Sequence, residues 1–287
     1  MGFWLADRVH DGATCAAGKA GARVPSDQCR KLQLMAASRA RTRPAPWQLA
    51  LGALRVATSG MLRGAEDAMI TLYGFANIFP EGRGETKDLR VQWALEELGL
   101  PYRFHGLDHT AGDLDSASFG EISPFRQAPV IDDDGFVVAE SAAIVLYLAE
   151  KAGKLIPPDV QGRTHVAQWC FAAVSTLGAT LTSLDLIEIF DSEKVAKRLH
   201  AETRKLVNRW LSDLDRHLQA RAWIAATSFT VADITMAGVL RTIRKTNLMD
   251  PHPKVQAYYE RCTARPAWQR TLALSAERLG MSVEAIR

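Results

Sequence analysis

The sequence predicts two consecutive domains, an α/β domain followed by an all-helical domain. Three observations support this prediction. Short β-branched segments alternate with helical patterns up to residue 153, a proline-containing stretch follows, and no convincing strand appears after residue 163. The chain of 287 residues is long enough for both domains. We therefore expect an extension over 1–68, an α/β domain over 69–153, a linker over 154–163 and a helical domain over 164–287.

The composition is typical of a water-soluble globular chain, with 47% hydrophobic and 23% charged residues. No run approaches the roughly 18 apolar residues that a membrane-spanning helix needs, so we expect no such helix. The cysteines form no CxxC pair and no short-spaced cluster, which argues against a disulfide framework or a zinc site. This pattern fits a reducing compartment, so we expect a cytoplasmic protein without a metal. The four cysteines are Cys15, Cys29, Cys170 and Cys262.

Residues 1–68 differ from the rest of the chain. They carry ten basic and five acidic residues, a local charge of +5, whereas the remainder carries 25 basic and 27 acidic residues. Because this stretch is rich in Ala, Arg and Gly and has little periodicity, we expect a disordered extension or a start codon placed too far upstream. A transit peptide is the alternative. The nearly balanced charge of the remainder gives no reason to expect a nucleic-acid or membrane partner.

The α/β domain opens with a strand–helix–strand unit. Residues 69–75 (MITLYGF) have the apolar, β-branched pattern of a strand, and a loop rich in breakers follows over 76–86. The segment 86–100 (TKDLRVQWALEELGL) reads as an amphipathic helix, and 101–109 (PYRFHGLDH) reads as the second strand. Such a unit favours parallel strands joined by a right-handed crossover.

A hairpin and a helix complete the first domain, and helices make up the second. APVIDD and GFVVAE are short strands joined by the turn DDDG, and SAAIVLYLAEKAG is the helix that follows. In the second domain Thr230 and Asp233 form the pattern of a helix-capping box. The predicted helices of that domain cover 164–190, 193–218, 231–245, 253–261 and 267–279.

Four motifs, in order, resemble the glutathione transferase superfamily. ALEELGLPY is similar to the end of the family's first helix. The family's proline, turn and Glu-Ser signature resembles the segment ISPFRQAPVIDDDGFVVAESAAIVLYLAEK. FTVADITMA resembles the capping box of the family's helical domain, and HPKVQAYYERCTARPAWQR resembles its tail. The resemblance covers about 69–280. It implies a thioredoxin-like first domain followed by a helical bundle, the glutathione transferase fold.

The Glu-Ser pair suggests where a ligand binds. Ser141 is a good N-cap for the helix that follows it, and unpaired N–H groups at a helix start attract an anion. The resemblance implies that this anion is the γ-glutamyl carboxylate of glutathione, and that Glu140 balances the ammonium group of the peptide. It also implies a cis Pro129, a backbone contact from Ala128 to the cysteinyl part, and a contact from Gln127 to the glycine end.

The catalytic residue stays open between alternatives. The chemistry needs a hydrogen-bond donor near the glutathione sulfur, because the thiolate is the nucleophile. The resemblance implies either Thr86, at the start of the first helix, or Tyr73, at the end of the first strand. Asn77 or a backbone donor is a further alternative. Glu85, as an anion, would disfavour a thiolate, and no cysteine lies in this region.

The resemblance implies a glutathione transferase that joins the thiolate of reduced glutathione to hydrophobic electrophiles in detoxification. The expected partners are glutathione as co-substrate, a small electrophile and a second copy of the chain in a homodimer. Two alternatives remain: a glutathione-dependent disulfide reductase or peroxidase, and a non-catalytic binding or regulatory module with the same fold.

Overall fold

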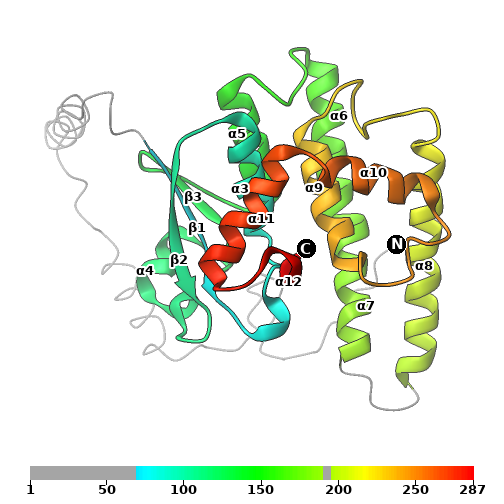
Figure 1. The fold of residues 1–287 in the computed structure, drawn as a ribbon, viewed down its shortest axis with the longest axis horizontal. Coiled ribbons are helices and arrows are strands. Elements are labelled where there is room, and N and C mark those ends of the chain that lie inside the picture. Colours follow the sequence, from blue (N-terminus) through cyan, green and yellow to red (C-terminus); the bar gives the residue numbers. More distant parts are fainter. Residues whose placement is uncertain (1–68, 190–194) are drawn as a thin grey trace, which may run out of the picture. The chain divides into compact units, whose positions relative to one another are not determined.

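The computed structural model describes residues 69–189 and 195–287 (Figure 1). The predicted extension, with Cys15 and Cys29, therefore lies outside the described residues. The described chain has an α/β domain followed by a helical domain, as the sequence predicts.

A four-stranded sheet forms the centre of the α/β domain, in the order β2-β1-β3-β4. Strands β1 (Ile70–Asn77) and β2 (Tyr102–Asp108) are parallel, which confirms the predicted crossover unit. Strands β3 (Val130–Asp133) and β4 (Phe136–Ala139) form the predicted antiparallel hairpin, and β3 also pairs antiparallel with β1.

Helices cover both faces of this sheet. Ile70 and Leu72 of β1 belong to the main core with α3 (Asp88–Leu98) and α5 (Ser141–Ala152). Tyr73 and Phe75 alternate onto the other face, against a second core cluster that includes Phe119. Phe119 belongs to α4 (Ala117–Ile122), a helix that the sequence analysis missed because it is short and buries a single residue. Two 3-10 turns, η1 (Pro80–Gly82) and η2 (Asp113–Asp115), complete the domain.

The helical domain begins earlier than expected. Helix α6 starts at Val160, inside the range assigned to the linker, because the Asp159 carboxylate caps it by accepting a hydrogen bond from the Gly162 N–H at 2.8 Å. A short final helix, α12, was also not predicted. The elements of this domain are α6 (Val160–Phe171), the π-helical segment η3 (Ala172–Gly178), α7 (Ala179–Ile189), α8 (Val195–His217), α9 (Val231–Leu240), η4 (Arg241–Ile243), α10 (Pro253–Thr263), α11 (Pro266–Leu279) and α12 (Val283–Ile286).

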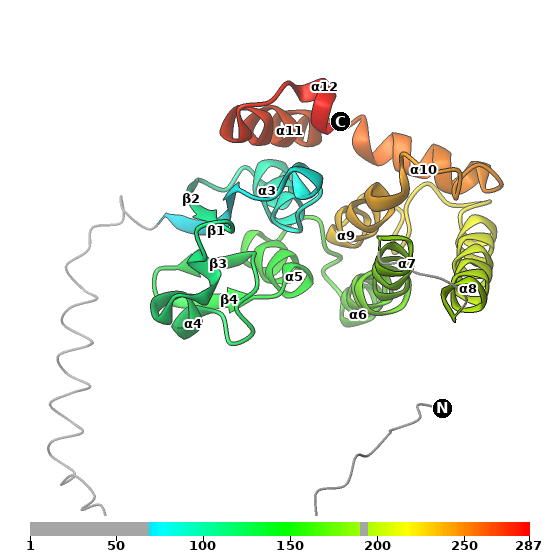
Figure 2. The same ribbon diagram turned by 90° about the horizontal axis from the view of Figure 1, so that it is seen from below.

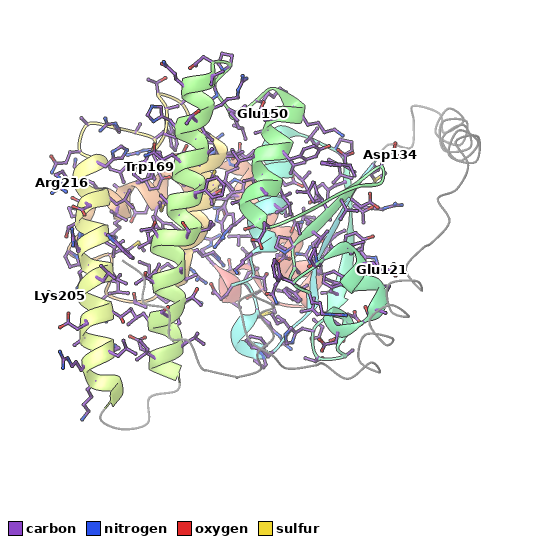
Figure 3. All side chains as sticks on the ribbon, turned by 180° about the vertical axis from the view of Figure 1, so that it is seen from behind. Glu121, Asp134, Glu150, Trp169, Lys205 and Arg216 are labelled. Atoms are coloured by element: carbon purple, nitrogen blue, oxygen red, sulfur yellow. The ribbon has the colours of Figure 1, made fainter. Side chains whose placement is uncertain are left out.

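One helical stretch bears on membrane association. The continuous run Val160–Glu188 meets the length and composition of a membrane-spanning helix, with a mean hydropathy of 1.5, which the sequence analysis did not expect. Its side chains also pack within the helical domain, where the Trp169 ring lies 4.6 Å from the ring of His217 on α8. Figure 3 shows Trp169 at this junction, and Lys205 and Arg216 along the exposed face of α8.

Helix α9 lies against α3 and α5 of the first domain and against α6 and α10 of the second (Figure 2). The predicted capping box at its start is confirmed, because the Asp233 carboxylate accepts hydrogen bonds from the Thr230 N–H at 2.8 Å and the Thr230 hydroxyl at 3.0 Å. Helix α11 packs on α3, where Arg265 pairs with both carboxylate oxygens of Glu97 at 2.6 and 2.7 Å. The two domains therefore share one core.

Candidate functional site

All five residues that the sequence analysis assigned to glutathione binding line one cavity of about 250 Å³. The cavity lies beside the start of β3 and the start of α5, so segments separated in sequence meet there. Its lining residues are Lys87, Ser123, Pro124, Phe125, Gln127, Ala128, Pro129, Ala139, Glu140 and Ser141.

The loop before β3 is held by one buried hydroxyl. Ser123 donates to the Gln127 carbonyl and accepts from the Gln127 N–H, both at 2.9 Å. The peptide bond between Ala128 and Pro129 is cis, as expected. Arg126 turns away from the cavity and donates to the Ser116 carbonyl at 2.6 Å. This loop therefore presents Gln127 and Ala128 to the cavity in a fixed backbone conformation.

The expectation that Ser141 is the N-cap of its helix is wrong. Glu140 is the N-cap residue, with φ 72° and ψ 114°, and Ser141 is the first residue of α5. The reason is that this positive φ turns the chain at Glu140, so the first intrahelical bond runs from the Ile144 N–H to the Glu140 carbonyl at 2.9 Å. Ser141 remains at the helix start, where backbone N–H groups lack intrahelical acceptors.

A buried guanidinium adds positive charge at this helix start. Arg90 donates to the Ser141 hydroxyl and to the Gly238 carbonyl, each at 3.4 Å. Within the described part of the chain it has no carboxylate partner at ion-pair distance, and burial lowers the pKa of Arg90 to about 10, so it is still charged at neutral pH. A charge without a counter-ion and a helix N-terminus together favour an anionic group of a ligand.

A second cavity of about 890 Å³ lies between the two domains. Eight of its fifteen lining residues are charged, so charged groups stand beside the apolar surface expected for a hydrophobic electrophile. It shares Lys87, Glu140 and Ser141 with the first cavity, so the two adjoin there. The other lining residues are Glu85, Arg90, Val174, Gly178, Ala179, Thr182, Asp185, Glu188, Val239, Thr242, Arg244 and Lys245.

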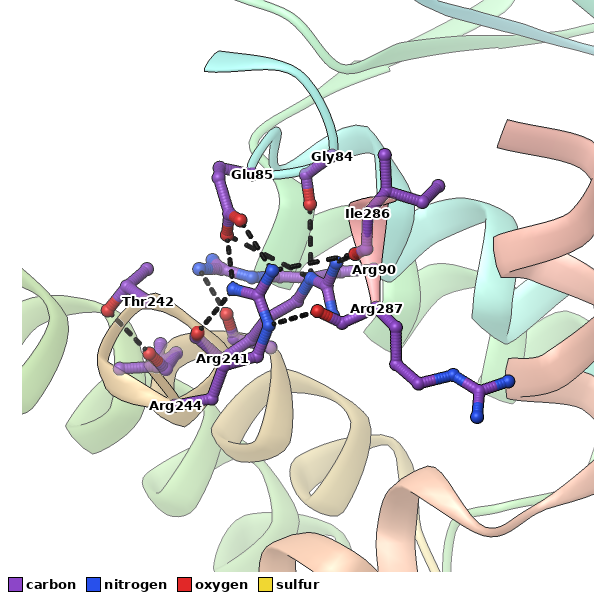
Figure 4. A network of polar contacts seen from close by, with 10 residues as sticks. Gly84, Glu85, Arg90, Arg241, Thr242, Arg244, Ile286 and Arg287 are labelled. Atoms are coloured by element: carbon purple, nitrogen blue, oxygen red, sulfur yellow. Dashed lines mark hydrogen bonds and ion pairs between the residues drawn. The ribbon is translucent and has the colours of Figure 1, made fainter. Parts of the chain in front are cut away.

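An ion-pair network fixes the loop that precedes α3 (Figure 4). Arg244 pairs with both oxygens of Glu85 at 2.6 and 2.8 Å, and Arg241 lies 4.0 Å from the same carboxylate. Arg241 also donates to the Gly84 carbonyl at 3.1 Å and to the Ile286 carbonyl. The negative charge of Glu85 is therefore compensated, which weakens the objection that it would disfavour a thiolate nearby.

The catalytic candidates from the sequence lie outside the lining of both cavities. The Tyr73 ring stacks 4.8 Å from the His105 ring on the sheet face that carries α4. The Asn77 amide donates to Asp108 and Thr110. Thr86 directly precedes Lys87, which occupies the N-cap position of α3.

Two charged residues of the cavity lining that the sequence analysis did not single out are Lys87 and Arg90. A signal for both was present, because a cation in the first turn of a helix opposes the helix dipole and needs another explanation. Their separation of three residues also places them on one face of α3.

The described cysteines cannot supply a nucleophile. Cys170 and Cys262 are both buried and free, and burial raises the pKa of Cys170 to about 12. Neither of these two thiols is therefore available to react at this site. In the described residues no cluster of His, Cys, Asp or Glu side chains has the arrangement of a metal site.

Two family models match the chain. Residues 89–151 match the model described as "Glutathione S-transferase, N-terminal domain", and residues 185–270 match "Glutathione S-transferase, C-terminal domain". The first match covers α3 through α5, and the second covers most of the helical domain.

Similar proteins agree with these models. Glutathione S-transferase D7 of Drosophila melanogaster is 29% identical over 188 residues, which cover 63% of this chain and 82% of that protein. The disulfide-bond oxidoreductase YfcG of Escherichia coli is 29% identical over 194 residues, which cover 64% of this chain and 88% of that protein. A glutathione transferase of Burkholderia graminis, with two glutathione molecules bound per subunit, aligns with a TM-score of 0.63 and 27% identity, covering 75% of this chain and 91% of that one.

Proposed function

Because the chain belongs to the glutathione S-transferase superfamily, we propose that it binds glutathione in the first cavity and uses the glutathione thiolate on a second substrate in the adjoining cavity. The observation that carries this proposal is that the two cavities meet at Lys87, Glu140 and Ser141. A sulfur bound at that junction would reach both the first cavity and its neighbour.

The γ-glutamyl carboxylate of glutathione would bind at the start of α5. The Ser141 hydroxyl and the backbone N–H groups there are donors, and the Arg90 guanidinium beside them supplies an opposite charge. Glu140 lines the same cavity and would accept from the peptide's ammonium group. Ala128 would pair its backbone with the cysteinyl part, and Gln127 would reach the glycine end.

The first activity is conjugation. The thiol releases its proton to solvent, and the thiolate forms a sulfur–carbon bond while the leaving group departs with its electron pair. Holding both reactants in adjoining cavities makes this step effectively unimolecular. Because about half of the residues that line the second cavity are charged, its electrophile would carry polar or charged groups beside an apolar part.

A second activity, reduction of disulfides, is favoured by the same charged lining. The thiolate would attack one sulfur of a polar disulfide, forming a mixed disulfide and releasing a thiolate, and a second glutathione would complete the exchange. Two similarities support it: the relative named as a disulfide-bond oxidoreductase, and the related structure with two glutathione molecules per subunit.

We also propose a cytoplasmic homodimer. Phe125, at the edge of the first cavity, is 81% exposed, more than any other large hydrophobic side chain among the described residues. An apolar ring at this exposure fits a contact with a second copy of the chain.

The test of the proposed function is a calorimetric titration of reduced glutathione into the full chain and its Ser141→Ala variant. Because a hydrogen bond to a charged group contributes about 1.5–3 kcal/mol, we expect Kd to rise roughly tenfold or more in the variant. Ser183→Ala, on an exposed position of α7 that lines neither cavity, is the matched control. Conjugation and disulfide turnover are then assayed on the same protein. Binding without either turnover would indicate a non-catalytic module, and no binding would contradict the proposal.

A further inference from the structure

Among the described residues, Lys87 is the only cation that lines both cavities. Glu140 and Ser141 are the other described residues that line both, and a sulfur that is bound in one cavity and reacts in the other must lie beside these three. Glu140 is an anion, and the Ser141 hydroxyl already accepts from Arg90. We propose that the Lys87 ammonium is the group that stabilises the glutathione thiolate, an inference that rests on the proposed function.

The position of Lys87 in α3 supports this role. It occupies the N-cap position with φ −73° and ψ −17°, and its side chain makes no capping hydrogen bond. Lysine is unfavourable there, because a helix N-terminus already carries partial positive charge. Lys87 therefore does not stabilise the helix. An anion at the junction, in contrast, would be attracted by both the Lys87 ammonium and the helix start.

The charges around Lys87 leave its ammonium available. Its side chain is exposed, and in residues 69–189 and 195–287 it has neither a hydrogen bond nor an ion pair. Glu85, two residues away in sequence, is bound by Arg244. The charged groups that line the second cavity around it are Glu85, Arg90, Glu140, Asp185, Glu188, Arg244 and Lys245.

The step moves a single proton. The glutathione thiol loses its proton to solvent, and the sulfur keeps the electron pair that later forms the new bond. Lys87 neither takes up this proton nor forms a covalent bond. A positive charge within a few ångströms favours the thiolate and therefore lowers the thiol pKa, as for cysteines beside lysine or arginine.

The experiment measures the pKa of the bound thiol by following thiolate ultraviolet absorbance against pH, in the full chain saturated with reduced glutathione. Lys87→Met keeps the length of the side chain and removes its charge. We expect this variant to raise the pKa of the bound thiol by about one unit. At pH values below that pKa, the conjugation rate should then fall about tenfold. Lys87→Arg, which keeps the charge, should restore the low pKa.

Three variants serve as comparators. Lys245→Met removes a lysine that lines only the second cavity, and it should leave the bound-thiol pKa unchanged. Thr86→Val and Tyr73→Phe remove the hydroxyls of the two other candidates and should also leave it unchanged. An unchanged pKa in Lys87→Met, or a raised one in Thr86→Val or Tyr73→Phe alone, would overturn the role of Lys87. Saturable binding of glutathione with an unchanged pKa would leave the proposed function standing, whereas no binding by the parent chain would overturn both.

Discussion

The Arg90 guanidinium lies 3.4 Å from the Ser141 hydroxyl, so a buried positive charge from the first helix of the α/β domain meets the start of its last helix. Within residues 69–189 and 195–287, Arg90 otherwise donates only to the Gly238 carbonyl of α9, also at 3.4 Å. Both hydrogen bonds are long, and neither acceptor is charged. The arrangement is therefore better suited to hold a ligand carboxylate than to stabilise the empty fold.

Replacing Arg90 tests this directly. Arg90→Met removes the buried charge and keeps most of the apolar contact, so we expect glutathione affinity to fall about tenfold or more while the unliganded melting temperature does not fall. Arg90→Lys keeps the charge and should lose less affinity. Calorimetry and thermal unfolding measure the two effects. Unchanged affinity in Arg90→Met would show that the carboxylate does not bind there.

Asp88 makes stability depend on pH. It is 1% exposed, and burial raises its pKa despite the hydrogen bond from Thr86 and the Arg278 guanidinium 4.0 Å from one carboxylate oxygen. A raised folded pKa means that the folded state binds more protons, so this group's contribution to stability is lost as pH rises from about 4.

Asp88→Asn removes that ionisation. We expect the melting temperature of the variant minus that of the parent to increase as pH rises from about 4 to about 7. Asp115→Asn, an exposed carboxyl on η2, is the control and should show a constant difference. A difference for Asp88→Asn that is flat or declines with pH would contradict the linkage.

Gly84 holds the loop before α3 against the end of the chain. Its φ is +78°, and a Cβ added there would lie 2.8 Å from the Ile286 Cβ. Gly84→Ala therefore adds a steric clash to a backbone cost of roughly 1–2 kcal/mol. Gly112→Ala is matched, since φ is +84° and no atom lies within 4 Å of the added Cβ.

We expect both alanine variants to unfold at lower temperature, and Gly84→Ala to fall further. For a protein of this size about 1 kcal/mol corresponds to roughly 2–4 °C. Thermal unfolding of the two variants side by side isolates the contact with Ile286, and equal shifts would mean that the contact contributes nothing.

The exposed ring of Phe125 tests the proposed homodimer. Phe125→Ser removes a large apolar surface from a side chain that is 81% exposed. We expect light scattering to report a dimer for the parent and a shift toward monomer for the variant. Phe136→Ser, on β4 at 56% exposure, is the comparison and should remain dimeric. A parent that is monomeric at all concentrations would contradict the homodimer.

Much of the fold was predictable because its signals are local. The parallel β1–β2 pair, the β3–β4 hairpin and the capping box of Thr230 each follow from short patterns. Helix α4 was missed because six residues with a single buried side chain leave almost no periodicity. The early start of α6 depends on one cap, Asp159, in a stretch whose prolines suggested a linker.

The site was predictable only where its residues adjoin in sequence. Gln127 to Pro129 and Glu140 to Ser141 stand in two recognisable motifs, and the fold brings them to one cavity. The positive φ of Glu140, which moves the helix start, carries no sequence signal of its own. The charges of Lys87 and Arg90 at the start of α3 are visible in the sequence, but the contact of Arg90 with Ser141 spans 51 residues and forms only once α3 and α5 have packed together.

The most direct test of the account is an experimental structure of the full chain with reduced glutathione. The account predicts one glutathione in the first cavity, with its γ-glutamyl carboxylate at the start of α5 beside Arg90 and its sulfur at the junction beside Lys87. Glutathione bound away from α5, or a sulfur turned away from the second cavity, would contradict it.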